Sequence, residues 1–409
     1  MKGRRNRNRG VILALMAVIG VIVAIVGLAM IQLGHHARMT AVRTVQVISA
    51  RCAADAGMAE ALYKMQQTLI SVGTWTDAPP SVSNISLAGS FARYGYTITG
   101  SPSGGYQIDA TGTCGPMSRI THATVVVSSY WKGIGVKETV LVDNKPVFQV
   151  YDPIGSGDIF EIHSNSTDRS AMVFKQIVTV PGDVVCGPGV SESALPSVID
   201  TKDQTVIMGE CYSADKILEF PPVSAPLPAD YLEAEIRTTS APTVTLNVGG
   251  VHQYPSIQMP NSGILKIAAP ISDPNHPVIV YVVGDMGMNM GAQVIVEAGS
   301  ALALYLGGNL TNNNSVGFIN NTNDPRRLKI YGLPTCHSID LKNSSALYAA
   351  VYAPDADITM FNSSLFSGAV TGESFTLKES GIFEFDTRLR EVNIDDPAAQ
   401  FVVGRWWEN

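Results

Sequence analysis

The fold is decided by residues 11–34, which read VILALMAVIGVIVAIVGLAMIQLG and carry no charged side chain. As a helix with a rise of about 1.5 Å per residue, this stretch is about 36 Å long, enough to cross the roughly 30 Å hydrocarbon core of a bilayer. We therefore predict a membrane anchor at 11–34. A cleaved signal peptide is the alternative, but its apolar region is usually only about 7–15 residues long and ends at a small-x-small cleavage site.

Basic residues flank this anchor asymmetrically. Five of them precede it, at Lys2, Arg4, Arg5, Arg7 and Arg9. The first dozen residues after it contain only Arg38 and Arg43 as fixed positive charges. Under the positive-inside rule, the basic leader 1–10 stays in the cytoplasm. We expect a single-pass inner-membrane protein whose bulk is periplasmic or extracellular.

The helix is expected to continue well beyond the membrane. The first proline is Pro79, and small or apolar residues recur at intervals of three and four between Val45 and Leu69, the period of one helix face. Glu60 and Lys64 add an i,i+4 ion pair, and a glycine at 73 is the expected stop. We predict one helix of nearly sixty residues, half in lipid and half packed on a soluble head.

A row of small residues follows one face of the membrane segment, at Ala14, Ala17, Gly20, Ala24 and Gly27. Small side chains let two membrane helices approach closely, so this row is a candidate site of helix packing. The alternative is compositional, because alanine and glycine are common in membrane spans.

The composition outside the anchor favours strands and turns over soluble helices. Charged residues make up 15% of the 409 residues, and there are 37 glycines and 23 prolines beside many Asn, Ser and Thr. This length predicts two or three domains beyond the anchor. The formal charge is −7 and no basic patch is visible, so nucleic acid is not an expected partner.

Three segments of alternating polarity follow the helix, at 92–99, 105–111 and 119–128. Tyr94, Tyr96 and Ile98 share one side of the first segment, and turn-forming residues separate the segments. We predict a three-stranded antiparallel meander whose apolar side packs on the soluble half of the long helix.

The N-terminal part of the chain resembles the pilin-like superfamily. The resemblance is carried by Arg9-Gly10 directly before the apolar span, by AADAGMAEA at 53–61, and by YTITG at 96–100 and GYQID at 105–109. Over residues 1–130 the chain is most similar to PilX-like minor pilins of type IV pili and to K-type minor pseudopilins of type II secretion. The resemblance implies association with other pilin or pseudopilin subunits through the helix.

In that family a prepilin peptidase cuts after the glycine, which is Gly10 here, so that the mature chain starts at Val11. Most members carry a glutamate at the fifth mature position, where this chain has Leu15. K-type members also lack the glutamate, and its absence suits a subunit at the tip of a filament, which has no subunit above it. Whether Gly10 is cleaved stays open.

From about Phe148 the sequence changes to short apolar runs, each four to six residues long and spaced by about eight to twelve residues. This cadence is typical of a sandwich, a barrel or a parallel β-helix. A β-helix is favoured because runs such as ALALYL at 301–306 lack an exposed polar phase, and because the turns are rich in Asn, which can stack between coils. Residues 345–358, 362–370 and 381–386 also resemble the β-helical C-terminal domain of some PilX-type pilus-assembly proteins.

The expected fold is therefore a membrane-anchored α+β pilin-like head followed by an all-β, right-handed parallel β-helix. Its expected parts are a basic leader 1–10, a transmembrane segment 11–34, a helix and meander 35–130, a connection 131–147, a β-helix 148–390 and a C-terminal tail 391–409. In the tail, Trp406 and Trp407 are expected to cap the last coil, because an open β-helix end exposes apolar core.

Five cysteines suit an oxidising compartment. Cys186 and Cys211 bracket a Pro/Gly/Ser-rich stretch, and a bridge between them would close a loop of about 25 residues, contributing about 3 kcal/mol in the chain-entropy model. Cys52 on the helix and Cys114 at the second meander turn are a second candidate disulfide. Cys336 is expected as a buried thiol.

No motif points to catalysis or to a bound cofactor. The seven histidines are scattered, without HExxH or CxxC, so no metal site is expected, and G-x-S-x-G, P-loop and dinucleotide fingerprints are absent from the sequence. Asp355 and Asp357 fit a turn better than a calcium site. Met286, Met288 and Met290 fit an apolar coil better than a Cu(I) site.

Two classes of function remain. In the first, a non-catalytic subunit inserts its helix into a type IV pilus or related filament and displays the β-helix outside for tip, assembly or adhesion roles. In the second, the β-helix is a membrane-tethered carbohydrate-active enzyme or a glycan-binding protein, since fold alone cannot separate these functions. Arg326, Arg327 and Lys329 then contact an acidic glycan, although a solvated turn explains them equally.

We favour the first class, because an enzyme should gather acidic and basic side chains on one face of neighbouring coils, where the sequence shows mainly Asn, Ser and small apolar residues. No catalytic residue and no cofactor is assigned. The expected partners are the lipid bilayer, other pilin or pseudopilin subunits, prepilin peptidase and a surface glycan.

Overall fold

A computed structural model describes the chain except for residues 1–6, 73–80, 102–104, 154, 156, 158–159, 203, 238–242, 271–275, 314–316, 344, 363, 379, 391–395 and 409, and except for the side chains of 7–14, 69–72, 343 and 362. The chain forms two compact units. The first, the sheet unit, comprises Met1–Met65, Asp77–Val126 and Val403–Asn409. The second, the β-helix unit, comprises Gln66–Thr76 and Val127–Val402.

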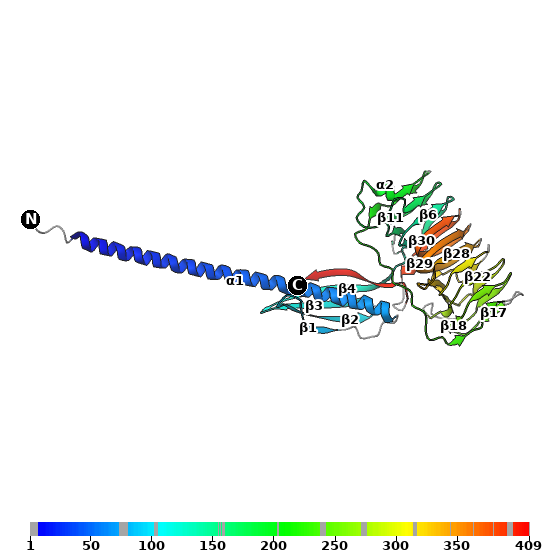
Figure 1. Cartoon of the computed structure of the whole chain (residues 1–409), viewed down its shortest axis with the longest axis horizontal. Helices are drawn as coiled ribbons and strands as arrows, with labels where there is room; N and C mark the ends of the chain where they lie inside the picture. The colour runs from blue at the N-terminus through cyan, green and yellow to red at the C-terminus, as the bar shows by residue number, and fades with distance from the viewer. Residues whose placement is uncertain are drawn as a thin grey trace, which may run out of the picture. The chain divides into compact units, whose positions relative to one another are not determined.

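The helix α1 runs without a break over Arg7–Val72, 66 residues in all (Figure 1). At about 1.5 Å per residue it is about 99 Å long. The single long helix predicted from the proline-free pattern is therefore confirmed. The expected stop at 73 lies outside the described residues.

The sheet unit contains five strands in the order β1-β2-β3-β4-β32. Their bounds are β1 Val82–Ser86, β2 Arg93–Ser101, β3 Gly105–Cys114, β4 Met117–Ser129 and β32 Ala399–Glu408. The pairs β1–β2, β2–β3 and β3–β4 are antiparallel. The predicted meander is confirmed as β2, β3 and β4, whereas β1 and β32 were not foreseen.

The last strand changes the interpretation of the C-terminus. Trp406 and Trp407 belong to β32, which neighbours β4 in this sheet. The prediction that they cap the last coil is wrong, because β32 completes the sheet of the other unit. The meander is thus extended at one edge by β1, which follows the helix, and at the other edge by β32, the last strand.

Small residues let α1 pack closely on this sheet. Its fully buried positions recur at the spacing of one helix face, at Ala50, Ala53, Ala54, Met58, Ala61 and Met65. Opposite them, a Cβ on Gly112 would lie 2.0 Å from the carbonyl oxygen of Ala50 and 2.4 Å from the amide nitrogen of Ala54. Only glycine fits there, because neither neighbour is a side chain that can rotate away.

We expect Gly112→Ala to lower the free energy of unfolding of the sheet unit by about 3 kcal/mol, since the methyl group must push helix and sheet apart. Denaturant unfolding of the detergent-solubilised chain, followed by a probe in the sheet unit, measures this loss. Gly404→Ala is the matched control, because a Cβ there has its nearest neighbour at 3.6 Å and should change little. Equal stability of both variants would contradict close packing at Gly112.

The β-helix unit is built from coils of three short strands. The first coil holds β5 Gly133–Val136, β6 Val140–Asp143 and β7 Val147–Tyr151. Of these strands, β5 and β6 lie within residues 131–147, which the sequence predicts as a connection. Each strand pairs in parallel with the strand three places later, as in β5–β8, β6–β9 and β7–β10. The following elements are β8 Glu161–Ser164, β9 Met172–Phe174, β10 Thr179–Val180, β11 Asp183–Cys186, α2 Leu195–Val198, β12 Ile199–Thr201, β13 Val206–Ile207 and β14 Cys211–Ser213.

After a crossover segment, residues 214–230, a second series of coils begins. Its strands again pair in parallel at an offset of three, as in β18–β21, β19–β22 and β20–β23. The first elements are β15 Tyr231–Leu232, β16 Ile236–Arg237, β17 Thr243–Leu246, β18 Gly250–Tyr254, β19 Ile257–Met259, β20 Ile264–Ile267, β21 Val278–Val282, β22 Met286–Met288 and β23 Gln293–Val296. The others are β24 Leu302–Leu306, β25 Leu310–Asn312, β26 Phe318–Asn320, η1 Pro325–Arg327, β27 Leu328–Gly332, β28 Ser338–Asn343, β29 Leu347–Asn362, β30 Leu365–Lys378, β31 Ile382–Asp386 and η2 Thr387–Arg390.

The two series join into one stack because the last coil pairs with the first. β30 lies parallel to β5 and β6, and β31 lies parallel to β7. Figure 1 shows β6, β30, β29 and β28 in one row. The predicted parallel β-helix is confirmed, but its coils are not stacked in chain order. Its hand stays a prediction.

The chain therefore enters and leaves this unit at neighbouring points. The backbone N–H of Tyr130 donates to the carbonyl of Ala398 at 3.0 Å, and the Ser129 hydroxyl donates to the carbonyl of Leu389 at 2.8 Å. The β-helix is accordingly an insertion between β4 and β32.

A cluster of phenylalanines fills the core where the first and last coils meet. Phe383 in β31 lies 5.7 Å from Phe148 and 6.0 Å from Phe160, measured between ring centroids. It also lies 5.0 Å from Phe366 and 6.0 Å from Phe375 of β30. All five rings are buried. Phe383 thus connects the beginning of the β-helix to its end.

We expect Phe383→Ala to destabilise the β-helix unit by about 4 kcal/mol, because it removes a ring shared by both coils and leaves a cavity. The half-exposed Phe361→Ala is the matched control and should cost far less. Chemical unfolding monitored by tryptophan emission, or limited proteolysis at 131–151, separates the two. A loss for Phe383→Ala no larger than for Phe361→Ala would show that the coils are held together elsewhere.

Candidate functional site

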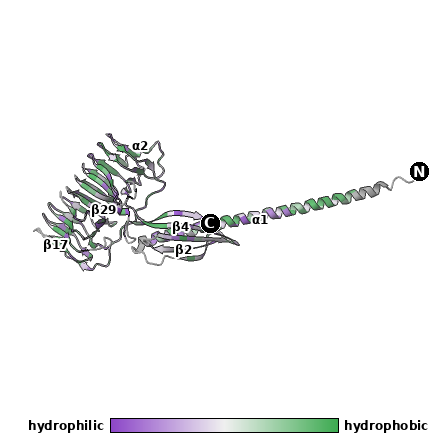
Figure 2. Ribbon diagram, turned by 180° about the vertical axis from the view of Figure 1, so that it is seen from behind, coloured by the Kyte–Doolittle hydropathy of each residue, from purple (hydrophilic) through white to green (hydrophobic). Residues whose placement is uncertain are grey.

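The exposed part of α1 is the candidate functional site. From Leu15 to Val45 every residue except Gly27 is exposed. Large apolar side chains crowd this part of the helix, at Leu15, Met16, Val18, Ile19, Val21, Ile22, Val23, Ile25, Val26, Leu28, Met30, Ile31 and Leu33. Figure 2 shows the part of α1 that carries these side chains mainly in the green of hydrophobic residues. Water does not accommodate an apolar surface of this extent, so the helix requires an apolar partner.

By length and composition α1 is able to cross a membrane, and no other helix among the described residues meets that criterion. An uninterrupted helix satisfies its own backbone hydrogen bonds, which is the condition for lying in hydrocarbon. The predicted anchor is confirmed as a helix with an uncovered apolar surface. Its orientation across the bilayer stays a prediction.

The row of small residues lies on this exposed part. Ala17, Gly20 and Ala24 are exposed and Gly27 is half-buried. A Cβ at either glycine would meet no atom of the described residues within 4 Å. The row is therefore open to a helix from another molecule. Ala14 and the cleavage residues Gly10 and Val11 belong to α1, but their side chains lie outside the described residues. Their roles stay predictions, and Leu15 is 59% exposed.

Polar contacts pin the other half of α1 to the sheet. Glu60 accepts hydrogen bonds from Lys64 at 2.6 Å, the predicted i,i+4 pair, and from the Tyr94 hydroxyl of β2. The hydrogen bond from Lys64, followed by that from Tyr94, outweighs burial and lowers the pKa of Glu60. The Thr121 hydroxyl of β4 donates to Asp55 at 3.3 Å. The helix is thus fixed at one half and uncovered at the other.

The final strand adds two contacts to the same unit. Trp407 stacks on His122 of β4 with 5.3 Å between ring centroids and an interplanar angle of 18°. The His122 ring in turn lies 2.7 Å from the carboxylate of Asp109 in β3. Glu408 pairs with Arg51 of α1 at 3.1 Å. Trp406, by contrast, is 47% exposed.

All five cysteines are free thiols in the structure, so neither predicted disulfide is formed in it. Cys211 lies opposite Val184 and Cys186 opposite Ser213 on the adjacent strands β14 and β11. That offset of two residues puts the two Cα atoms about 8 Å apart, beyond the reach of a disulfide. Cys52 is exposed on α1, whereas the neighbouring Ala50, Ala53 and Ala54 are buried.

Cys336 is buried, as expected, and burial raises the pKa of its thiol to about 12. The methionine prediction holds for two of three residues. Met286 and Met288 are buried in β22, but Met290 lies after the strand and is 73% exposed. The coil turns there, so the extended geometry that would align all three ends before Met290.

Two of the three basic residues near η1 are paired with carboxylates of this chain. Lys329 is buried and pairs with the buried carboxylate of Asp396, which also accepts a hydrogen bond from the Tyr331 hydroxyl at 3.1 Å. The Arg326 guanidinium makes a bidentate pair with Asp324, at 3.1 and 2.8 Å. These internal pairs oppose the polysaccharide interpretation for Arg326 and Lys329, and for Arg327 that interpretation stays a prediction.

The crossover segment is held on the β-helix by an amide clamp. Asn165 donates to the carbonyl of Leu218 at 2.7 Å and accepts from its N–H at 2.9 Å. The clamp is extended by His163, whose ring lies 3.1 Å from Asn165 and 3.5 Å from Glu161. Glu161 also pairs with Lys132 at 3.3 Å. Within the described part of the chain, no three His, Cys, Asp or Glu side chains group as metal ligands would.

This network predicts a pH dependence. Burial raises the pKa of Glu161, but the hydrogen bond from His163 and the charge of Lys132 outweigh it, and the pKa lies below its ordinary value of 4.5. The stabilisation is therefore present above pH 4.5 and is lost as pH falls through the lowered pKa. We expect Glu161→Gln to reduce the free energy of unfolding by about 2 kcal/mol at pH 7 and by progressively less below pH 4.

Denaturant unfolding of both proteins between pH 3 and 7 measures the difference. Exposed Glu192→Gln is the control and should leave stability unchanged at each pH. A deficit for Glu161→Gln that stays constant with pH would assign it to packing rather than to the carboxylate charge.

These features define a class of protein with one long, half-uncovered apolar helix and a large β-rich head. The profile of a domain family described as a domain of unknown function, DUF7305, matches residues 271–392, which lie within the second series of coils. No curated protein matches the sequence. Among solved structures, the competence-associated pilin ComZ from Thermus thermophilus aligns with 89% of this chain and 98% of its own, at 12% identity and a TM-score of 0.25. A score of that size does not indicate a shared fold.

Proposed function

We propose that this chain is a pilin-like minor subunit that inserts α1 into the membrane and then into the helical core of a type IV pilus or a related filament. The observation that carries the proposal is the division of one unbroken helix into an uncovered apolar half and a half packed on an antiparallel sheet. A lipid bilayer can hold the uncovered half before assembly, and the helices of neighbouring subunits can hold it afterwards. The row of small residues supplies a face for such neighbours.

The proposal gives the β-helix a role outside the membrane, at a filament tip, in assembly or in adhesion. The basic leader supports this orientation through the positive-inside rule. Leu15 in place of an acid fits a tip subunit, because the family's glutamate contacts a subunit above. Prepilin peptidase is then the expected processing enzyme, cutting between Gly10 and Val11.

We also propose that the chain acts without catalysis. The buried ionisable side chains of the β-helix unit are engaged in internal pairs, such as Lys329 with Asp396 and His252 with Glu233 at 2.9 Å. The ring of His252 also contacts the carbonyl of Val248 at 3.2 Å, so both of its nitrogens are occupied. Such pairs support a structural role for these groups.

The test is the intact mass of the membrane-extracted chain together with its amount in sheared surface filaments. We expect the mass of a chain that starts at Val11, and we expect this chain to co-purify with the filaments. Gly10→Leu should abolish processing and filament incorporation, because the peptidase of the resembling family cuts after a glycine. Gly3→Leu in the same leader is the control and should do neither. A chain that keeps residues 1–10 and is absent from filaments would reduce α1 to a membrane tether and overturn the proposal.

A further inference from the structure

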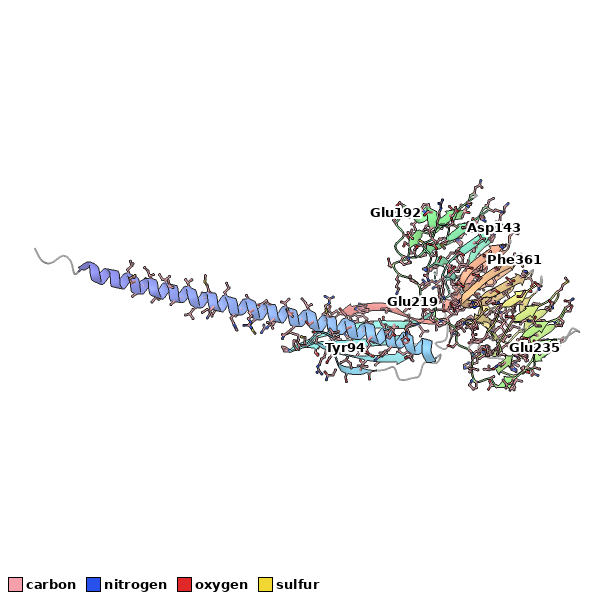
Figure 3. All side chains as sticks on the ribbon, viewed as in Figure 1. Tyr94, Asp143, Glu192, Glu219, Glu235 and Phe361 are labelled. Atoms are coloured by element: carbon pink, nitrogen blue, oxygen red, sulfur yellow. The ribbon has the colours of Figure 1, made fainter. Side chains whose placement is uncertain are left out.

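One edge of the β-helix carries a column of side chains that the sequence does not reveal. The column consists of one residue from each of six successive coils, in the order Lys342, Phe361, Lys378, Asp143, Lys175 and Lys202. Lys342 is in register with Phe361, and Lys378 with Asp143. The two lysines that follow strands β9 and β12 continue the row, since their N–H groups bond to the coil before. Figure 3 labels Phe361 and Asp143 along the same edge of the stack.

The Phe361 ring holds two of these cations in place. The ammonium nitrogens of Lys342 and Lys378 lie 5.3 and 5.5 Å from its centroid, one from the coil on each side. A cation over an aromatic ring is attracted without being neutralised. Among the described residues, no carboxylate pairs with Lys342, Lys378 or Lys175, whereas Lys202 pairs with Asp200 at 3.1 Å. The charges of Lys342 and Lys378, held at Phe361, and that of Lys175 are thus not neutralised by a salt bridge to a described carboxylate.

Hydroxyl groups form the neighbouring column on the same wall. Thr359 lies between Asp340 and Thr376 in register, and Thr311 continues the row on the other side of Asp340. Thr311 is exposed and the other three are half-exposed. Hydroxyl and carboxylate groups at fixed spacing are able to bond the hydroxyls of a ligand that lies beside the lysines.

We propose that this wall binds an acidic polysaccharide, laid along the stack with its carboxylate or sulfate groups on the lysine column and its hydroxyls on the threonine column. Coils are about 4.8 Å apart, so that Lys342, Lys378 and Lys175, each two coils apart, are spaced by about 9.6 Å. That spacing suits one negative charge per disaccharide. This binding site is distinct from filament membership. It rests on the proposed function only in requiring that the β-helix faces the outside.

Nucleic acid fits the same wall less well. Each strand of DNA carries a phosphate about every 3.4 Å, far denser than the lysines, and sequence-independent binding of a single strand normally uses several stacked aromatic rings. Phe361 is the one aromatic ring of the column, and both coils beside it contribute lysines to its faces. The formal charge of −7 on the whole chain also opposes a densely charged partner.

The test uses the full chain in detergent, immobilised on a sensor, with hyaluronate, which carries one carboxylate per disaccharide, as the acidic probe. Dextran is the neutral probe and single-stranded DNA is the alternative polyanion. We expect salt-dependent binding of hyaluronate and none of dextran. Lys342→Gln/Lys378→Gln should weaken binding about tenfold, and Phe361→Ala should weaken it by about twofold to threefold by releasing the two ammonium groups.

Lys216→Gln/Lys266→Gln removes the same charge elsewhere on this unit and should leave the affinity unchanged. Circular dichroism of each variant verifies that the β-helix is folded. Equal binding by the column variant and the control variant, binding of DNA but not of hyaluronate, or no binding of any probe would each overturn the proposal. None of these outcomes affects filament incorporation, which the mass and shearing experiment measures separately.

Discussion

The rest of the structure depends on one unbroken helix, α1, whose two halves require different surroundings. Over its first half α1 presents apolar side chains that none of the described residues covers, and over its second half it presents alanines to a sheet. The close approach at Gly112 and the hydrogen bonds of Glu60 and Asp55 fix that second half. Because the helix is continuous and its second half is fixed to the sheet, a partner that binds the apolar half also holds the sheet, without a flexible joint within the helix.

The β-helix is attached to this sheet through both of its ends. Because its last coil stacks on its first, with Phe383 shared between them, the chain returns close to where it entered and continues into β32. A β-helix stacked in chain order would release its C-terminus at a far end. The insertion therefore allows a large domain to be carried while the sheet is completed by Trp407 and Glu408. Coils on both sides of the junction also build the lysine column, which takes Lys342 and Lys378 from one series and Lys175 from the other.

Local periodicity made α1, the meander and the runs of the second series predictable from sequence, because each repeats at the interval of its own backbone. The insertion was not predictable, since the pairing of β31 with β7 joins residues more than 230 positions apart and leaves no local pattern. Trp406 and Trp407 were misassigned for the same reason. Cys186 and Cys211 do occupy adjacent strands, but their register, which spacing along the chain cannot supply, keeps them apart. The lysine column could not be recognised from the sequence because its members follow no fixed interval. The basic run at Arg326 stood out instead, although Arg326 and Lys329 are paired with carboxylates of this chain.

Filament membership requires that the uncovered half of α1 contacts other filament subunits. A photo-crosslinking residue at Gly20, on the row of small residues, tests this most directly when the chain is expressed in its native host and illuminated before filaments are sheared. We expect a crosslink to another filament subunit from Gly20. The crosslink from Ile22 should be weaker, because Ile22 lies on a different face of the helix. Crosslinks to lipid alone, with no adduct in the filament fraction from either position, would contradict filament membership.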